Sequence, residues 1–235
     1  MLFKKGSRLL VVAAHPDDET LGCGGTILKA ISMGVSVSVL FLGEGISARF
    51  DKKDYNTKEF LKATNKRQDG CIKALKILGV KDFEFNNYYC CQFDKINLLT
   101  FVKIIEKKIK KFNPDTIITH NINEVNIDHI KTFEALEVAS RPFLGSNLKL
   151  ILGMEIPCSG NWKFNQSFKP NFFVDINKFW KVKIKAWKCY KGEERQFPFP
   201  RSVEGIETMA KLRGMQSGLI KAEGFKLFRQ IISKD

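Results

Sequence analysis

Short apolar segments alternate with longer amphipathic segments over the first 140 residues, and this order constrains the fold more than any other feature. Residues 9–14 are six consecutive apolar residues, which is typical of a strand buried on both faces of a parallel sheet. Further strands are predicted over 35–42, 83–85 and 116–119, with helical segments between them. The alternation predicts an α/β fold: a right-handed, doubly wound, mostly parallel sheet flanked by helices.

Glycines and capping residues set the expected bounds of the helices. A glycine-rich turn over 22–25 is expected before a helix over 26–33, and Thr57 is expected to cap the next helix. Asp94 is a candidate cap for a third helix, and a fourth is expected over 128–140. After residue 140 the pattern is less regular, and the expected elements are two strands and two helices, over 148–156, 172–176, 178–191 and 203–215.

The length of 235 residues fits one domain and no linker divides the chain, so residues 1–235 are expected to form a single domain. No apolar run approaches the roughly 20 residues that cross a bilayer, so no transmembrane segment is expected. The apolar run at 9–14 follows basic residues, but it is too short for a signal peptide and lacks a small-residue cleavage site. A cytoplasmic location is therefore expected.

The chain is strongly basic, with a net charge of +14. A basic field can attract an anionic substrate, such as a nucleotide-linked or phosphorylated sugar, or a membrane surface. We favour the simpler interpretation that lysines solvate the outer faces of helices. Nucleic acid is not an expected partner, because the chain has no nucleic-acid motif and no regular alternation of basic and aromatic residues. Nothing in the sequence indicates an oligomeric state.

The six cysteines have no C-x-x-C spacing, and two of them are adjacent. In a chain of this size, that pattern indicates reduced and mostly buried thiols rather than a disulfide framework. The spacing also excludes a zinc ribbon.

All three histidines lie at or near predicted strand ends: His15 follows the first strand, His120 ends the fourth, and His129 lies in the segment after it. Ligands of open α/β sheets bind outside the carboxyl ends of the strands. With Asp18, His15 and His129 supply two imidazoles and one carboxylate, a ligand set that suits a catalytic zinc with an open position for water. Asp17 is then a free carboxylate beside the metal, where a general base is needed.

Each half of this arrangement also has a purely structural explanation. The His-Pro-Asp-Asp segment could be a turn with a capping aspartate, and Asp128-His129 could be a helix start. Because both segments follow predicted strands, we favour the metal site. His120 either lines the pocket, is a satisfied histidine at a strand end, or competes with His129 as a ligand.

Residues 12–19 and 21–26 resemble the opening signature of the LmbE/PIG-L zinc-dependent N-deacetylases. Further segments resemble later motifs of the family: Gly43-Glu44, Arg67 with Ala74 and Leu78-Gly79, and residues 126–129. C-terminal segments resemble a sugar-deacetylase branch: Arg201, Arg213-Gly214 and residues 222–225.

The resemblance implies a Rossmann-like fold, metal ligation by His15, Asp18 and His129, and Asp17 as the base. It also implies a small-molecule N-acetylated amino sugar as the substrate. One departure concerns the oxyanion, since Asn126 stands where many relatives have a histidine. An asparagine can still donate a hydrogen bond to an oxyanion, but it cannot carry a positive charge.

Other candidate residues have less specific signals. Asp128 could orient a ligand histidine or assist proton movement, as carboxylates next to metal ligands commonly do. Glu19 could contact sugar hydroxyls or cap the turn, and Arg201 is a further candidate for substrate binding. Arg67 is either a ligand for a substrate hydroxyl, phosphate or acetate, or a helix-surface arginine. A second departure bears on Arg67, because Gly70 stands on the same helix where relatives often have a glutamate.

The leading hypothesis is a zinc-dependent N-deacetylase for an amino sugar of surface-glycan biosynthesis, with another divalent metal as an alternative to zinc. A second hypothesis keeps this chemistry but takes an N-acetylglucosaminyl conjugate on the path to a low-molecular-weight thiol. A third is a catalytically silent, metal-stabilised carbohydrate-binding protein, which Asn126 and Gly70 permit. The retained Asp17 argues against the third hypothesis.

Overall fold

The apolar run near the start of the chain forms β1 (Arg8–Ala13), an inner strand of a seven-stranded sheet. The structure is a computed structural model, and it describes residues 3–232. The strand order is β3-β2-β1-β4-β5-β7-β6. The first five strands pair in parallel, and β7 pairs antiparallel with β5 and with β6. The other bounds are β2 (Ser36–Gly43), β3 (Asp82–Tyr88), β4 (Thr116–His120), β5 (Leu150–Met154), β6 (Phe172–Asp175) and β7 (Ala222–Gln230).

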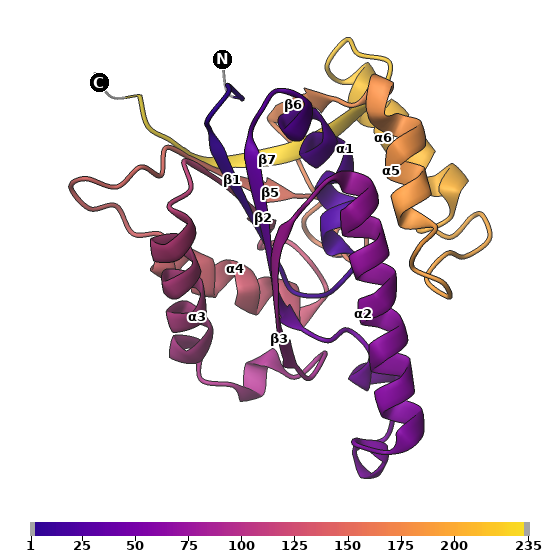
Figure 1. Cartoon of the computed structure of the whole chain (residues 1–235). Coiled ribbons are helices and arrows are strands. Elements are labelled where there is room, and N and C mark those ends of the chain that lie inside the picture. The colour runs from indigo at the N-terminus through magenta and orange to yellow at the C-terminus, as the bar shows by residue number, and fades with distance from the viewer. Residues whose placement is uncertain (1–2, 233–235) are drawn as a thin grey trace.

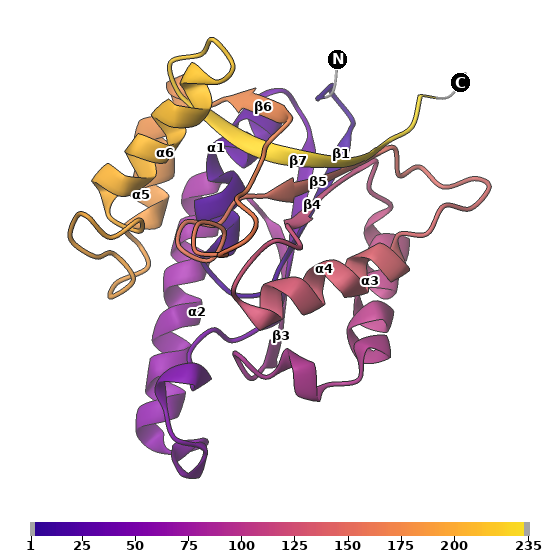
Figure 2. The ribbon, with the colours of Figure 1, turned by 180° about the vertical axis from the view of Figure 1, so that it is seen from behind.

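Helices cover both faces of this sheet (Figures 1 and 2). One face carries α3 (Leu98–Phe112) and α4 (Ile127–Ala139). The other face carries α1 (Asp18–Ser32), α2 (Lys58–Leu78), α5 (Trp180–Trp187) and α6 (Val203–Met215). Short 3₁₀ turns complete the connections: η1 (Ser47–Arg49), η2 (Lys52–Asp54), η3 (Phe93–Lys95) and η4 (Asn177–Phe179). The predicted doubly wound, mostly parallel α/β fold is confirmed.

The protein has two hydrophobic cores, one on each face of the sheet, and β1 contributes side chains to both. Leu9, Val11 and Ala13 pack into the core under α1 and α2, whereas Leu10 and Val12 pack into the core under α3 and α4. Successive side chains of a strand point to opposite faces, so a strand buried on both faces must be apolar throughout. This geometry explains the uninterrupted apolar run.

The sequence predicted a glycine-rich turn before a helix over 26–33, whereas the structure has helical residues on both sides of a kink in this segment, and both parts belong to α1. The helix begins at Asp18 and continues through Cys23, whose backbone is kinked (φ −147°, ψ 19°). A Cβ atom on Gly22 would lie 2.7 Å from the Met154 sulfur, and one on Gly25 would lie 2.6 Å from Ile176 Cγ2. These glycines therefore allow the helix to pack closely on the sheet.

Several other bounds match or correct the expectations. The side chain of Thr57 caps α2, as predicted, by accepting a hydrogen bond from the Phe60 N–H. Asp94 lies in η3 instead of capping α3, and Asn97 is the cap. The helix expected over 178–191 is shorter, because η4 and α5 share that segment. Strand β7 was not predicted at all.

Within residues 3–232, none of the helices is both long enough and apolar enough to span a membrane.

Candidate active site

The three histidines come together at the carboxyl edge of the central strands, as the sequence predicted. His15 follows β1, and His120 is the last residue of β4, which pairs in parallel with β1. His129 lies in the first turn of α4, the helix that follows β4. Asp18 is the first residue of α1. All four side chains are buried.

His15, Asp18 and His129 offer ligand atoms that lie within 4.8 Å of one another. His15 Nδ1 is 3.7 Å from Asp18 Oδ2, and His129 Nε2 is 3.4 Å from Asp18 Oδ1. Asp18 Oδ1 is buried and has no hydrogen-bond partner. A buried carboxylate oxygen without a partner is costly, and a cation held between it and the two imidazoles would satisfy it. The residues present therefore fit a divalent metal ion.

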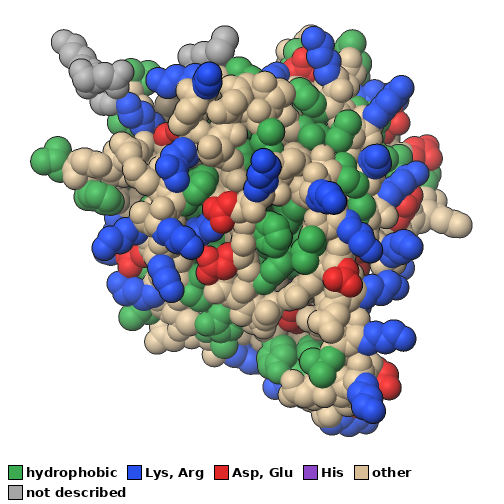
Figure 3. All heavy atoms as spheres, viewed as in Figure 1, with side chains coloured by type: hydrophobic (Ala, Val, Ile, Leu, Met, Phe, Trp, Pro, Cys, Tyr) green, Lys and Arg blue, Asp and Glu red, His purple; other side chains and the backbone are tan. Residues whose placement is uncertain are grey.

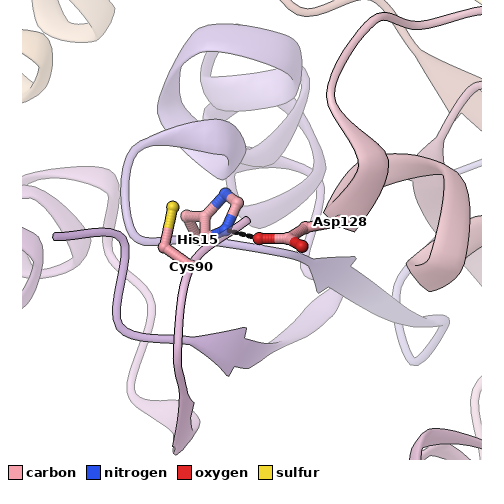
Figure 4. Close-up of side chains that lie close together, drawn as sticks. All are labelled: His15, Cys90 and Asp128. Atoms are coloured by element: carbon pink, nitrogen blue, oxygen red, sulfur yellow. Dashed lines mark hydrogen bonds and ion pairs between the residues drawn. The ribbon is translucent and has the colours of Figure 1, made fainter. Parts of the chain in front are cut away.

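Each of the two imidazoles is oriented by a second carboxylate. His15 Nε2 is 2.8 Å from Asp128 Oδ2 (Figure 4), and His129 Nδ1 is hydrogen-bonded to Glu124 Oε2. Metal-binding histidines usually bond their other ring nitrogen in this way, which fixes the ring and makes the ligand nitrogen more basic. Asp128 thus lies where a positioning role was expected.

Sequence reasoning missed Glu124. Its position five residues before His129 was the available signal, but that spacing has no fixed meaning. Glu124 also accepts a hydrogen bond from the Ser159 hydroxyl at 2.7 Å. Burial raises the pKa of Glu124, but the neighbouring His129 and His120 outweigh it and hold the pKa at about 2. The carboxylate is therefore ionised at neutral pH.

Two other groups of side chains also bring potential ligand atoms together: His15 with Cys90 and Asp128 (Figure 4), and His120 with Glu124 and His129. In the first group His15 Nε2 is already hydrogen-bonded to Asp128, and in the second His129 Nδ1 is already bonded to Glu124. In the group that contains Asp18, the unpartnered Oδ1 lies 3.4 Å from His129 Nε2. The group that contains Glu124 also has an unpartnered carboxylate oxygen, Oε1, which lies 3.9 Å from the unpartnered His120 Nδ1, but its third member, His129, already uses Nδ1 in the hydrogen bond to Glu124 Oε2.

His120 lies behind the candidate ligands. Its Nε2 accepts a hydrogen bond from the Ala14 N–H at 2.9 Å, and its ring stacks on His129 with 3.9 Å between centroids. It is fully buried. One ring nitrogen of His120 is therefore satisfied at the strand end, whereas Nδ1 is buried without a hydrogen-bond partner.

Asp17 is not the free carboxylate that the sequence suggested. Its Oδ2 lies 2.8 Å from Arg67 and 3.3 Å from Arg201, and its backbone has a left-handed φ of 119°. Burial raises the pKa of Asp17, and the two arginines oppose this effect. A carboxylate held in this balance is oriented by its partners and is more basic than an exposed aspartate.

Arg67 and Glu19 both contact Asp17. Arg67 is buried rather than on the helix surface, is paired with Asp17 and Glu193, and lies 5.4 Å from the Tyr190 ring centroid. Glu19 is fully buried and accepts hydrogen bonds from Tyr190 and from the Asp17 N–H. Burial raises the pKa of Glu19 to about 7. Both residues therefore hold Asp17 in place, Arg67 through the carboxylate and Glu19 through the backbone N–H.

A cavity of about 490 Å³ opens beside the site. Its wall includes Asn126, whose Oδ1 caps α4 by accepting from the Asp128 N–H at 2.9 Å, so its amide NH₂ is the remaining donor. Charged and aromatic side chains form the rest of a wide rim: Arg49, Arg195, Arg201, Glu193, Trp162 and Phe199. The cavity combines cationic groups with aromatic surface.

A model of the family described as PIG-L, GlcNAc-PI de-N-acetylase, matches residues 10–140, which is more than half of the chain. The chain belongs to the PIG-L family. The matched residues include His15, Asp18, Glu124 and His129. Arg201 and Glu193 lie outside the matched segment.

Relatives of this chain include sugar deacetylases. Diacetylchitobiose deacetylase of Thermococcus kodakarensis is 25% identical over 95% of this chain and 84% of its own length. A probable N-acetyl-alpha-D-glucosaminyl L-malate deacetylase 2 of Bacillus anthracis is 29% identical over 58% of this chain and 60% of its own length. The PIG-L family is thus a deacetylase family, and membership in it supports a hydrolytic activity for this chain.

The fold also occurs with another activity. The solved structure of the 4-carboxy-2-hydroxymuconate hydratase of Pseudomonas putida has a TM-score of 0.77, covers 97% of this chain and 99% of that chain, and is 20% identical. A likeness at this identity shows the fold alone. Since one fold can carry several reactions, the reaction must be argued from the site.

Proposed function

We propose that this chain is a zinc-dependent N-deacetylase that removes the acetyl group from an N-acetylated amino sugar. His15, Asp18 and His129 hold the metal in this proposal, and Asp17 is the general base. The observation that carries it is the unpartnered, buried Asp18 Oδ1 facing His129 Nε2, with both imidazoles backed by a carboxylate. The sugar-deacetylase relatives support the choice of substrate.

A divalent metal bound there supplies the polarisation of the acyl carbonyl and the acidification of the attacking water. The protein then has three tasks. Asp17 accepts the proton of the water and returns it to the departing amine, and Arg67 and Arg201 keep its carboxylate in place. Asn126 donates an amide hydrogen bond to the oxyanion that develops on the acyl carbon. Asp128 keeps His15 oriented.

We further propose that the amino sugar carries an anionic group, such as a phosphate or a nucleotide. The rim of the cavity has three arginines and one carboxylate. Arg49 is paired with that carboxylate, Glu193, and Arg195 adds a further positive charge to the rim. Trp162 and Phe199, with ring centroids 5.8 Å apart, offer an apolar surface for a sugar face. An N-acetylglucosaminyl conjugate with a carboxylate would meet the same groups.

The test measures acetate release and zinc content together. The zinc-loaded protein is incubated with N-acetylated sugars that are neutral, carboxylated, phosphorylated or nucleotide-linked. We expect acetate and free amine in equal amounts, with faster turnover of the anionic sugars at low substrate concentration. Asp17→Asn is expected to keep its zinc and to lower kcat by about 10² to 10⁴-fold. Asp94→Asn, an exposed aspartate in η3, is the control and should change neither.

The ligand assignment is tested in the same assay. His129→Ala should lose zinc, whereas His120→Ala should retain it, because its Nε2 is already used by the Ala14 N–H. Near-normal activity of Asp17→Asn would refute the role of the base. A zinc-loaded protein that releases no acetate from any sugar would favour a silent binding protein. Hydration of an unsaturated carboxylate by that protein would instead favour hydratase chemistry.

A further inference from the structure

Two adjacent cysteines lie beside the candidate site and have no part in the proposed reaction. Cys90 and Cys91 follow β3, and their sulfur atoms are 3.7 Å apart. Neighbouring side chains in an extended chain point to opposite sides. Here Cys91 has a left-handed φ of 58°, and the two thiols meet. Cys91 is exposed on the cavity wall, whereas Cys90 is buried near His15 (Figure 4).

The backbone of this pair is bonded to the candidate metal centre. The Cys91 N–H donates to Asp128 Oδ2, the same oxygen that lies 2.8 Å from His15 Nε2. The Cys90 N–H donates to Glu44 Oε1 at 3.0 Å and to the Ser47 hydroxyl at 2.6 Å. A movement of the Cys90–Cys91 peptide therefore withdraws a donor from the carboxylate that orients His15.

We propose that Cys90 and Cys91 form a reversible disulfide with each other when the protein meets a low-molecular-weight disulfide, and that this bond disables the metal centre through Asp128. The exposed Cys91 thiolate attacks one sulfur of the small disulfide, and a mixed disulfide forms while one small thiolate leaves. The Cys90 thiolate then attacks Cys91 Sγ, and the second small thiolate leaves. The two cysteine thiols lose two protons and two electrons, and the small disulfide is reduced to two thiols.

Chain geometry couples the bond to the backbone. The Cα atoms of adjacent residues are about 3.8 Å apart across a trans peptide, which is below the separation of about 4.4–6.8 Å that disulfides usually span. The sulfurs must also approach from 3.7 Å to about 2.05 Å. The peptide between Cys90 and Cys91 has to adjust, and a strained, exposed disulfide is readily reduced again.

The experiment treats the reduced, metal-free protein with oxidised glutathione and then blocks the remaining thiols by alkylation. Trypsin releases residues 82–95 as one peptide, which holds both cysteines and no other. We expect this peptide to lose the mass of two hydrogens and to carry no alkyl group or glutathione. Dithiothreitol should reverse the change. A persistent glutathione adduct on Cys91, or two alkylated cysteines, would overturn the proposal.

Coupling to the site is measured on the same samples by melting temperature and by zinc affinity. We expect oxidation to lower the Tm of the metal-free protein, because Asp128 loses a donor, and to weaken zinc binding by about 10 to 100-fold. Cys91→Ser should not respond to the oxidant, and Cys90→Ala should form only the glutathione adduct. Cys189→Ser, at a thiol that follows α5 and does not line the cavity, should respond like the wild type.

The outcomes separate this proposal from the proposed function. Disulfide formation and the Tm shift need neither zinc nor catalysis, so a protein without deacetylase activity can still show both. A disulfide that changes neither Tm nor zinc affinity would refute the coupling. An equal loss of zinc affinity in oxidised Cys91→Ser would place the sensitive thiol elsewhere, and Cys158, the second thiol of the cavity wall, would be the first alternative.

Discussion

The two carboxylate oxygen atoms of Asp18 lie in different environments. Oδ2 accepts the His15 N–H at 2.8 Å, and it lies 3.3 Å from His120 Nε2. Oδ1 is left buried and without a partner, 3.4 Å from His129 Nε2. The hydrogen bond to Oδ2 holds the carboxylate in an orientation in which Oδ1 faces His129. The short His-Pro-Asp-Asp segment therefore orients its own aspartate.

Local spacing explains which site residues could be predicted. His15 and Asp18 are three residues apart, and the strand-end rule brings His129 to the same edge, so these three could be located from the sequence. The partners of Asp17 could not, because Arg201 comes from 184 residues further along the chain. The sequence around an arginine does not distinguish a surface position from a buried ion pair. The role of Arg67 therefore stays open in the sequence.

Glu124 provides a prediction at this scale. Glu124→Gln keeps an acceptor for His129 Nδ1–H but removes the negative charge that makes the imidazole a stronger ligand. We expect zinc affinity to fall by about 10 to 100-fold, measured by competition with a chelator of known affinity. Glu134→Gln on the outer side of α4, where Glu134 pairs with Lys131, is the matched control. Equal affinities of the two variants would show that Glu124 does not act through His129.

Among the elements, α1 depends most on distant parts of the chain. Beyond the kink at Cys23, the N–H groups of Gly25 and Thr26 donate to the Glu223 carboxylate at 2.8 and 2.7 Å. Buried Lys183 neutralises this carboxylate at 2.6 Å. Glu223 in β7 thus caps the second half of a helix 197 residues earlier. Local capping rules cannot detect a cap from so far along the chain, although the second half of α1 begins close to the helix start predicted at residue 26.

Strand β7 illustrates the other limit. Its residues, Ala222–Gln230, mix glycine and charged side chains, and only the first half is buried. The inner strands of the parallel part of the sheet are buried and mostly apolar, so they could be predicted, whereas β7 lacks both that signal and a clear alternation. β7 lies near the C-terminal end of the chain, and it pairs with β5 and β6, which are far from it in sequence.

Gly70 in α2 gives the prediction for helix packing. A Cβ atom there would lie 2.8 Å from the Cys189 carbonyl oxygen, so α2 approaches this segment only because residue 70 has no side chain. The same contact explains why a glutamate would not fit. Gly70→Ala should lower the free energy of unfolding by about 1–3 kcal/mol through overpacking, although alanine favours helix by about 1 kcal/mol.

Urea unfolding measures the effect, and Gly24→Ala is the control. A Cβ atom on Gly24 would be no closer than 3.5 Å to Lys183 Cγ, which is ordinary contact. We expect Gly24→Ala to be as stable as the wild type or more stable by up to about 1 kcal/mol, because no clash offsets the helix preference of alanine. If Gly70→Ala were as stable as the wild type, the close approach of α2 to Cys189 would not be needed for the fold.

At the scale of the whole molecule, the exterior is basic, whereas the candidate site is rich in carboxylates. The face shown in Figure 3 carries many lysines and arginines, in keeping with the net charge of +14. The candidate site instead gathers buried carboxylates: Asp17, Asp18, Glu19, Glu124 and Asp128. A cationic exterior favours the approach of an anionic substrate, and an acidic interior favours a metal ion. The basic composition therefore does not conflict with a cation site.

This acidic interior predicts a large response to metal. Zinc that binds the folded state alone stabilises it by about 2.7 kcal/mol at one hundred times its Kd. For a chain of this size, that corresponds to a rise in Tm of about 5–10 °C. Calorimetry of the wild type should show the rise with zinc and its loss with a chelator. Magnesium, which prefers an octahedral set of oxygen ligands, should give a much smaller shift.

His129→Ala decides whether the stabilisation comes from this site. The variant keeps the exposed thiols and the other histidines, so zinc that binds elsewhere on the chain would still raise its Tm. We expect zinc to leave the Tm of His129→Ala nearly unchanged, because the remaining pair, His15 and Asp18, is too few ligands for tight binding. A shift equal to that of the wild type would place the zinc outside the site, and the acidic interior would then have to be explained without a metal.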